Sequence, residues 1–226
     1  MTIVWRSVAI LREEGLLVLC SRIFGETIYR RMLLMEHLLE KPSFACQKQS
    51  PVSSRWLSPD EAARYASFHQ ELTEEEICRR LSAGDRCFIG EMDGRIVHGF
   101  WVATSNAWID FLNLDLPLKP GELYLYQSFT PLERRGRGFA TAILASALEM
   151  LRREGFRRVL CCIQLDRAIA YPPPLRTGFV PAALVSSVRF GPRRWVFQRP
   201  TSRLPCFARH LPGKRTPRAV FSEAGR

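Results

Sequence analysis

A run of arginines and glycines between residues 131 and 141 is the part of the sequence best suited to chemistry. It reads Pro131-Leu-Glu-Arg134-Arg135-Gly136-Arg137-Gly138-Phe139-Ala140-Thr141. Glycine lacks a Cβ atom, so an anion can approach the backbone closely, and guanidinium groups bind phosphate through paired hydrogen bonds. The apolar repeat that starts at Ala140 predicts a helix here, and the free N–H groups and positive dipole of its first turn attract anions. We therefore expect the run to hold a pyrophosphate.

The surroundings of the run narrow the class of ligand. No Gly-Lys-Ser/Thr follows it, which disfavours a P-loop NTPase. Gly136-x-Gly138 is followed by Thr141 where a dinucleotide fold has a third glycine, and no acidic residue ends the next strand at Ile163. An ordinary Gly-rich turn with solvated arginines is the alternative interpretation. The three arginines, the preceding strand and the strong helix favour the anion site.

The same run resembles the GNAT superfamily of acyl-CoA-dependent N-acyltransferases. Arg135-x-x-Gly138-x-Ala140 fits the (Gln/Arg)-x-x-Gly-x-(Gly/Ala) motif of that family. Leu175-Arg-Thr-Gly178-Phe179 resembles the segment that closes the family's next helix, and the order of elements over residues 55–198 is similar. The resemblance implies acetyl-CoA, or another acyl-CoA, as co-substrate. It also implies a small-molecule amine acceptor that attacks the thioester directly.

The resemblance also implies where coenzyme A binds. Its diphosphate is expected on the N–H groups of residues 136–141, and its pantetheine arm beside the backbone of the preceding strand, which splays away from the following one. N–H donation near Phe129 would stabilise the oxyanion. Asp166 is interpreted first as a helix N-cap, although its family counterpart is often an asparagine that contacts the cofactor. The implied binding residues are Ser128, Phe129, Thr130, Arg134, Arg135, Gly136, Arg137, Gly138, Phe139, Ala140, Thr141 and Asp166.

A proton acceptor helps the reaction, because an amine is mostly protonated at neutral pH. Glu122 begins the central strand, where some family members carry a glutamate base, and a solvent-exposed strand-end carboxylate is the alternative interpretation. Asp110 and Asp115 are weaker candidates. Tyr124 and Tyr126 alternate along the same strand and face one side, so they either line the acceptor pocket or pack on the sheet.

Tyr171 is the candidate general acid for the departing thiolate, because a phenol with a pKa of about 10 suits that task. The family tyrosine lies four residues before the Gly-Phe pair, where this chain has Pro174. The three prolines at 172–174 argue against a regular helix at this point. A structural tyrosine packed under the prolines is therefore the alternative interpretation.

Strand signals both precede and follow helix signals, which predicts a mixed α/β fold with some antiparallel pairing. The resemblance implies a GNAT-like, mostly antiparallel sheet flanked by helices. An extended segment at 55–57 precedes helices that start at Ser58 and Thr73. A hairpin with an Asp93-Gly94 turn follows. Residues 107–112 form a strand or an irregular excursion. The remaining predictions are a strand at 122–130, a helix at 140–153, a strand at 159–163 and a final hairpin at 180–198.

Composition divides the chain into an N-terminal extension and linker (1–49), a central region (50–198) and a basic, unstructured tail (199–226). The resemblance implies that the central region is an acyltransferase domain of the GNAT type. Residues 1–40 are predicted to be helical, with apolar residues at helical spacing; the members of this set are Leu16, Leu19, Ile23, Ile28, Met32, Met35 and Leu39. The extension is expected to pack on the domain or at a homodimer interface. Attachment to a membrane surface or a partner protein is the alternative.

The net charge of +11 divides into +2, +3 and +6 over these three parts, so a basic nucleic-acid-binding face is not required and no nucleic-acid partner is expected. Seven cysteines without a CxxC pair indicate free thiols in a cytoplasmic protein. A location peripheral to a membrane is the alternative, and it depends on the N-terminal extension. Four scattered histidines predict no metal site.

The sequence as a whole favours an N-acyltransferase, with acetyl as the first choice of acyl group. The acceptor of first choice is an amino sugar in surface-polysaccharide synthesis, which follows from a loose similarity of the N-terminal region to acyltransferases of that process. The alternative is a non-catalytic module that binds CoA, a partner or a membrane and keeps a degenerate acyltransferase site.

Overall fold

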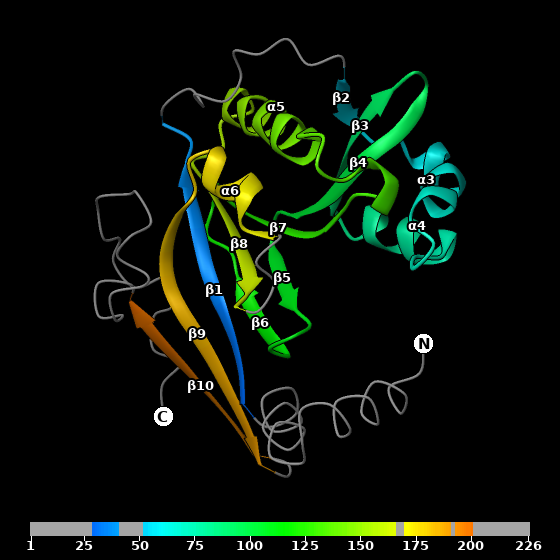
Figure 1. Cartoon of the computed structure of the whole chain (residues 1–226). Helices are drawn as coiled ribbons and strands as arrows, with labels where there is room; N and C mark the ends of the chain where they lie inside the picture. The colour runs from blue at the N-terminus through cyan, green and yellow to red at the C-terminus, as the bar shows by residue number, and fades with distance from the viewer. Residues whose placement is uncertain (1–28, 41–51, 166–169, 191–192, 201–226) are drawn as a thin grey trace, which may run out of the picture.

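An eight-stranded sheet organises the protein, whose computed structural model describes residues 29–40, 52–165, 170–190 and 193–200. The strand order is β10-β9-β1-β8-β7-β4-β3-β2 (Figure 1). β7 and β8 pair in parallel, and every other neighbouring pair in this sheet is antiparallel. The strands are β1 (Tyr29–Leu38), β2 (Ser53–Trp56), β3 (Arg86–Met92), β4 (Arg95–Ala103), β7 (Glu122–Phe129), β8 (Arg158–Gln164), β9 (Val180–Phe190) and β10 (Arg193–Pro200). The predicted mixed, mostly antiparallel fold is confirmed.

Helices cover parts of both faces of the sheet. The helical segments are η2 (Pro59–Glu61), α3 (Ala62–Phe68), α4 (Glu74–Ser82), η3 (Leu132–Arg134), α5 (Phe139–Arg153) and α6 (Pro172–Arg176). The apolar stripe of α5 packs on Leu123, Leu125 and Cys161, which point to one face. α3 and α4 pack around Trp101 on the other face. α6 lies beside α5 (Figure 1), so the helix that starts after the Arg/Gly run is fixed against the middle of the sheet.

Local sequence signals explain how these elements begin. Thr73 caps α4, because its hydroxyl accepts a hydrogen bond from the Glu76 N–H at 3.2 Å. Asp93 and Gly94 have φ angles of 52° and 70°, which is the positive-φ pair that a two-residue hairpin turn requires. The predicted β3–β4 hairpin and the predicted helix after Thr73 are confirmed.

The prediction of a helix is wrong for residues 29–38, which form β1. This strand is inserted between β8 and β9 and pairs antiparallel with both. Leu33 and Met35 face the α5 side of the sheet, whereas Met32 and Leu34 face the opposite side. A strand buried on both faces is apolar without alternation, so its period cannot be told from that of a buried helix.

The prolines at 172–174 do not prevent a helix, which corrects the expectation from the sequence. They occupy the first three positions of α6, whose N–H groups would have no intrahelical partner. The first available N–H, that of Leu175, donates to the Tyr171 carbonyl at 3.1 Å. α6 is therefore a short helix that begins immediately after Tyr171.

An antiparallel ribbon of β5 (Asn106–Ile109) and β6 (Leu114–Pro117) forms at the predicted strand or excursion. Ala107, Ile109 and Leu116 are buried against Tyr124 and Leu34 on the face opposite α5. The ribbon thus covers the part of this face that lies beyond α3 and α4.

Some predictions concern residues that lie outside the described ranges. They are the predictions for Asp166, for most of the N-terminal extension and for nearly all of the tail, which fall within residues 1–28, 41–51, 166–169 and 201–226. None of the helices within the described ranges has the length and apolar character needed to cross a membrane. The same part of the chain has no group of three or more His, Cys, Asp or Glu residues placed to hold a metal ion.

Candidate functional site

The parallel ladder between β7 and β8 ends halfway along both strands. Glu122–Leu125 pairs with Arg158–Cys161, whereas β7 continues to Phe129 and β8 to Gln164. Gln127, with φ of 48°, lies in a β-bulge that shifts the pairing of β7 with β4. Beyond Leu125 the two strands are no longer hydrogen-bonded to each other. Their facing backbone groups are therefore available to an extended ligand.

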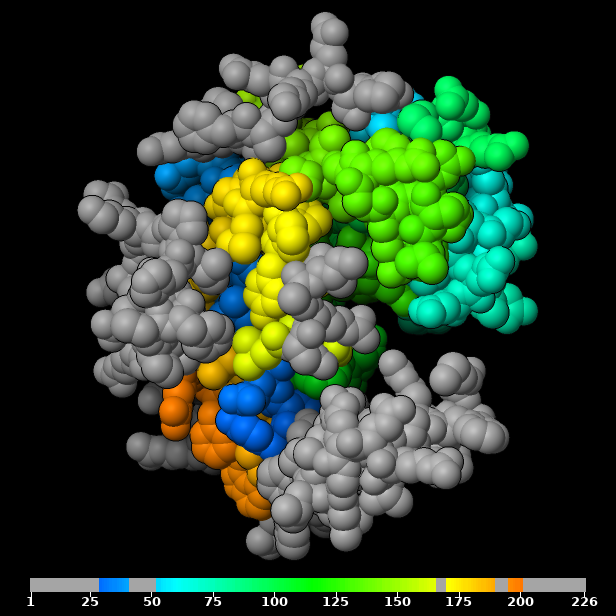
Figure 2. All heavy atoms as spheres, viewed as in Figure 1, coloured from blue at the N-terminus to red at the C-terminus, as the bar shows by residue number. Residues whose placement is uncertain are grey.

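The Arg/Gly run follows β7 directly and leaves an open anion site at the start of α5. Gly136 and Gly138 have φ angles of 76° and 80°, and a Cβ at either position would meet no atom within 4 Å. In the part of the chain described here, the backbone N–H groups of residues 138–141 make no hydrogen bond. Figure 2 shows this yellow-green segment at the molecular surface, next to the yellow α6. An anion can therefore reach the free N–H groups.

Three arginines lie in the loop that leads into this helix. Arg135 Nε donates to the Thr130 carbonyl at 3.0 Å, which closes the loop, while Arg137 is exposed. Arg134, Arg135 and Arg137 form no ion pair with another described residue. Phe139 is buried and offers only its backbone, whereas Ala140 and Thr141 are half-buried. Glu133 lies in the same loop but forms no ion pair with these arginines, so the loop keeps a net positive charge, which favours an anion.

The segment Ser128–Thr130 is held from two sides. Ser128 is exposed, and the Phe129 ring lies 4.2 Å from the His69 ring between centroids. His98 Nδ1 lies 2.7 Å from the Thr130 hydroxyl oxygen, and the ring also hydrogen-bonds to the Phe129 backbone. Sequence analysis missed His98 because its role depends on the pairing of β4 with β7 rather than on a motif.

We expect His98 to make the protein less stable in acid. Burial lowers the pKa of His98 to about 4, and its backbone hydrogen bond opposes this shift. In the unfolded chain His98 has a pKa near 6.5, so between pH 6.5 and 4 the unfolded chain binds more protons than the folded protein. The free energy of unfolding therefore falls as the pH drops through this window, by up to about 3 kcal/mol. Urea unfolding at several pH values measures the loss. His37 and His69 shift in the same direction, so the decisive comparison is His98→Gln, which should lose less stability in acid than the wild type.

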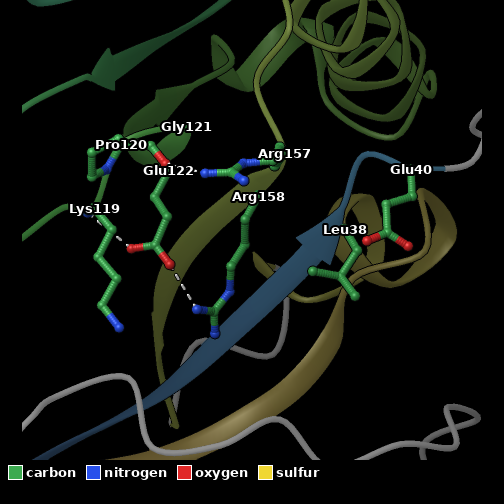
Figure 3. A pocket seen from close by; sticks show the side chains of 8 residues that line it. All are labelled: Leu38, Glu40, Lys119, Pro120, Gly121, Glu122, Arg157 and Arg158. Atoms are coloured by element: carbon green, nitrogen blue, oxygen red, sulfur yellow. Dashed lines mark hydrogen bonds and ion pairs between the residues drawn. The ribbon is translucent and has the colours of Figure 1, made fainter.

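Glu122 lies away from these groups, and the role of base proposed for it does not fit. It begins β7, seven residues before Phe129, or roughly 23 Å of extended strand. Its carboxylate binds Arg158 Nη1 at 2.8 Å and the Lys119 N–H at 3.1 Å (Figure 3). The same Arg158 also binds the buried Glu36 of β1. Glu122 is thus neither a free base nor a solvent-exposed carboxylate.

Tyr171 lies beside Gln164, the last residue of β8. Its hydroxyl is 3.4 Å from the Gln164 carbonyl oxygen, which is long for a hydrogen bond. The ring is half-buried against the core formed with α5. The hydroxyl therefore lies near Gln164, at the end of β8 that does not pair with β7.

The remaining candidates from the sequence separate into two groups. Asp110 and Asp115 are exposed at the β5–β6 ribbon, and Asp115 accepts a hydrogen bond from Asn106 at 3.2 Å. Tyr124 is buried, whereas Tyr126 is half-buried and immediately precedes the bulge. Of these residues, Tyr126 lies closest in the chain to the point where β7 and β8 separate.

The chain is similar to known proteins both in a family pattern of its sequence and in its fold. Residues 52–172, more than half of the chain, match the acetyltransferase (GNAT) family. No curated protein matches the chain.

Solved structures with a similar fold include a GCN5-related N-acetyltransferase from Sphaerobacter thermophilus, with 18% identity and a TM-score of 0.53 over 81% of this chain and 56% of that one. An acetyltransferase from the GNAT family of Colwellia psychrerythraea has 12% identity and a TM-score of 0.50 over 80% and 60%. A functionally unknown conserved protein from Staphylococcus epidermidis has 11% identity and a TM-score of 0.51 over 75% and 65%. The match spans less than two thirds of each solved chain, and such identities show the fold alone.

Proposed function

The chain belongs to the acetyltransferase (GNAT) family, and from that premise we propose that it transfers an acyl group, acetyl first, from a CoA thioester to an amine. The family uses an acyl-CoA as co-substrate and acts on small-molecule amines. The proposal rests on one observation: the β7–β8 ladder ends at Leu125, and the rest of β7 leads through an arginine-rich loop to the open start of α5. A thiol-bearing nucleotide needs both features, since its arm is extended and its diphosphate is anionic.

The residues present fit coenzyme A at this position. The free N–H groups of residues 138–141 and the side chains of Arg134, Arg135 and Arg137 would hold the diphosphate. After Leu125, β7 still pairs with β4 but no longer with β8, and the backbone edge that faces β8 would pair with the pantetheine arm, in the manner of an added strand. Thr130 is fixed by His98 and Arg135, so the turn between these two subsites is held in place before binding.

Direct attack by the amine accounts for the chemistry without a covalent enzyme intermediate. The amine nitrogen forms a bond to the thioester carbonyl carbon, and a backbone N–H of β7 near Phe129 stabilises the developing oxyanion. The C–S bond then breaks, and the Tyr171 hydroxyl gives its proton to the thiolate. The phenol is regenerated by a proton that the new amide nitrogen loses.

Tyr171→Phe should lower turnover about tenfold or more while leaving CoA affinity within about twofold, because the substitution removes a proton donor but keeps the packed ring. Thiol release measures turnover, and calorimetry measures affinity. Leu175→Ala, a change in the same packed region of α6, is the control for a loss of packing alone. Wild-type turnover in Tyr171→Phe would assign the tyrosine a structural role.

The experiment that tests the proposed function is a thiol-release screen over amines with acetyl-CoA and longer acyl-CoAs. An amino sugar of surface-polysaccharide synthesis is our first acceptor, and free and nucleotide-linked amino sugars therefore head the screen. Acylated product together with free thiol is the expected result. CoA binding without thiol release for any acceptor would favour a non-catalytic CoA-binding module instead.

A further inference from the structure

We infer that the Asp85 carboxylate, oriented by the Tyr126 hydroxyl, binds the acceptor as a protonated aliphatic amine and takes up its proton. The inference rests on the proposed function and deepens it, because it names the proton acceptor and the class of acceptor. Tyr126 follows Leu125, the last β7 residue paired with β8, and precedes the bulge at Gln127. The pair therefore stands at the point where the two strands separate.

The geometry of the pair leaves one carboxylate oxygen available. The Tyr126 hydroxyl donates to Asp85 Oδ2 at 2.5 Å. Asp85 is half-buried between α4 and β3, and no ion pair or hydrogen bond joins its Oδ1 atom to any other residue that the structure describes. Burial raises the pKa of Asp85, and it raises that of Tyr126 too. The phenol thus stays protonated as a donor, while the carboxylate is a better proton acceptor than an exposed aspartate.

Other charged and titratable groups around Asp85 are already engaged or buried. Arg80 of α4 lies over the rings of Trp101 and Tyr126, at 5.2 Å and 5.5 Å from their centroids. Its charge is matched by Glu76 at 2.6 Å, and it also donates to the Gln127 side chain. Arg79, on the same helix, binds Glu76 as well.

From β3, the Cys87 thiol is buried and its pKa is raised to about 12, so it remains neutral. The charges of Arg80 and Arg79 act on Asp85 and lower its pKa, against the larger effect of burial. Among the described residues, however, no cationic group is within ion-pair distance of the Asp85 carboxylate. An ammonium group would form that ion pair.

The step balances without a further reactant. The ammonium nitrogen gives one proton to Asp85 Oδ1, and its freed electron pair forms the N–C bond to the thioester carbonyl. The C–S bond breaks, and the second nitrogen proton leaves with the thiolate as the free thiol of CoA by way of Tyr171. Asp85 then returns its proton to solvent.

The test compares amines that are protonated at neutral pH with hydroxylamine, which is not. Glucosamine, ethanolamine and lysine methyl ester serve as the protonated probes. We expect Asp85→Asn to lower kcat/KM about 100-fold for the probes that the wild type acylates, and to remove the acidic limb of their pH profile. Turnover of hydroxylamine should change less than about threefold, because no proton has to be removed before its attack.

Three further variants keep this test decisive. Asp93→Asn is the matched control, since it makes the same chemical change in the exposed β3–β4 turn. Asp85→Glu should recover part of the lost activity, because it restores a carboxylate. Tyr126→Phe keeps the carboxylate and should lower kcat/KM about tenfold for the protonated amines. This variant replaces Asp85→Asn as the test if Asp85→Asn does not fold.

The outcomes separate this inference from the proposed function. An equal loss of turnover with hydroxylamine, or none with the protonated amines, overturns the role of Asp85. Acylation of hydroxylamine but of none of the three protonated probes overturns the class of acceptor. A wild-type protein that does not bind CoA in calorimetry refutes the proposed function itself, and the inference with it.

Discussion

Gly138→Asp is expected to weaken CoA binding by more than about 100-fold. Gly138 is the N-cap of α5, with φ of 80°, and open space surrounds the position where a Cβ would lie. An aspartate there places a negative charge among the free N–H groups that would bind the diphosphate, so repulsion replaces attraction at the positive end of the helix. Isothermal calorimetry with CoA and with acetyl-CoA measures the loss.

Gly155→Asp provides the matched control at the other end of the same helix. Gly155 follows the last turn of α5, its φ is 88°, and a Cβ there also meets no atom within 4 Å. Both substitutions therefore impose the same backbone strain and add the same charge. CoA affinity should be unchanged in Gly155→Asp. Equal affinity of the two variants for CoA would refute the anion site at the start of α5.

Arg158→Met should lower the free energy of unfolding by about 3–5 kcal/mol, because it leaves two buried carboxylates without a counter-charge. Arg158 binds Glu36 of β1 and Glu122 of β7, and the side chains of the two glutamates are 2% and 10% exposed. The arginine therefore links three neighbouring strands of the sheet. Urea denaturation followed by circular dichroism measures the change.

The neighbouring arginine supplies the control for this substitution. Arg157 is exposed, and its Nη2 donates to the Pro120 carbonyl at 2.9 Å. Arg157→Met should change stability by less than about 1 kcal/mol. Combining Arg158→Met with Glu36→Leu and Glu122→Leu should recover most of the lost stability, because no buried charge then remains. A single Arg158→Met variant as stable as the wild type would contradict the account of this charge cluster.

The position of β1 connects this cluster to the proposed function. β1 lies outside residues 52–172, which match the family, yet it occupies the middle of the sheet and pairs with β8 over seven residues. β8 forms one side of the segment where pairing with β7 ends. Strand β1 therefore borders the proposed cofactor site through β8, although it lies outside the family match.

The local elements were predictable because short-range rules specify them. The α5 stripe, the Asp93-Gly94 turn and the cap at Thr73 each depend on residues within one or two turns of chain. The Arg/Gly run belongs to this group, since its glycines and the following helix are contiguous. A segment whose neighbours in the chain decide its conformation can be interpreted without the rest of the molecule.

Local patterns in the chain are enough to specify the loop before a helix and the succession of strands and helices around it. The position of β1 within the sheet and the contacts of Glu122 with Arg158, His98 with Thr130 and Asp85 with Tyr126 arise in the folded molecule alone. These contacts bring together residues far apart in the chain, and strand order and register decide them. An apolar run that is buried on both faces fits either a helix or a strand. The position of a carboxylate in the sequence does not show which distant side chain it will bind.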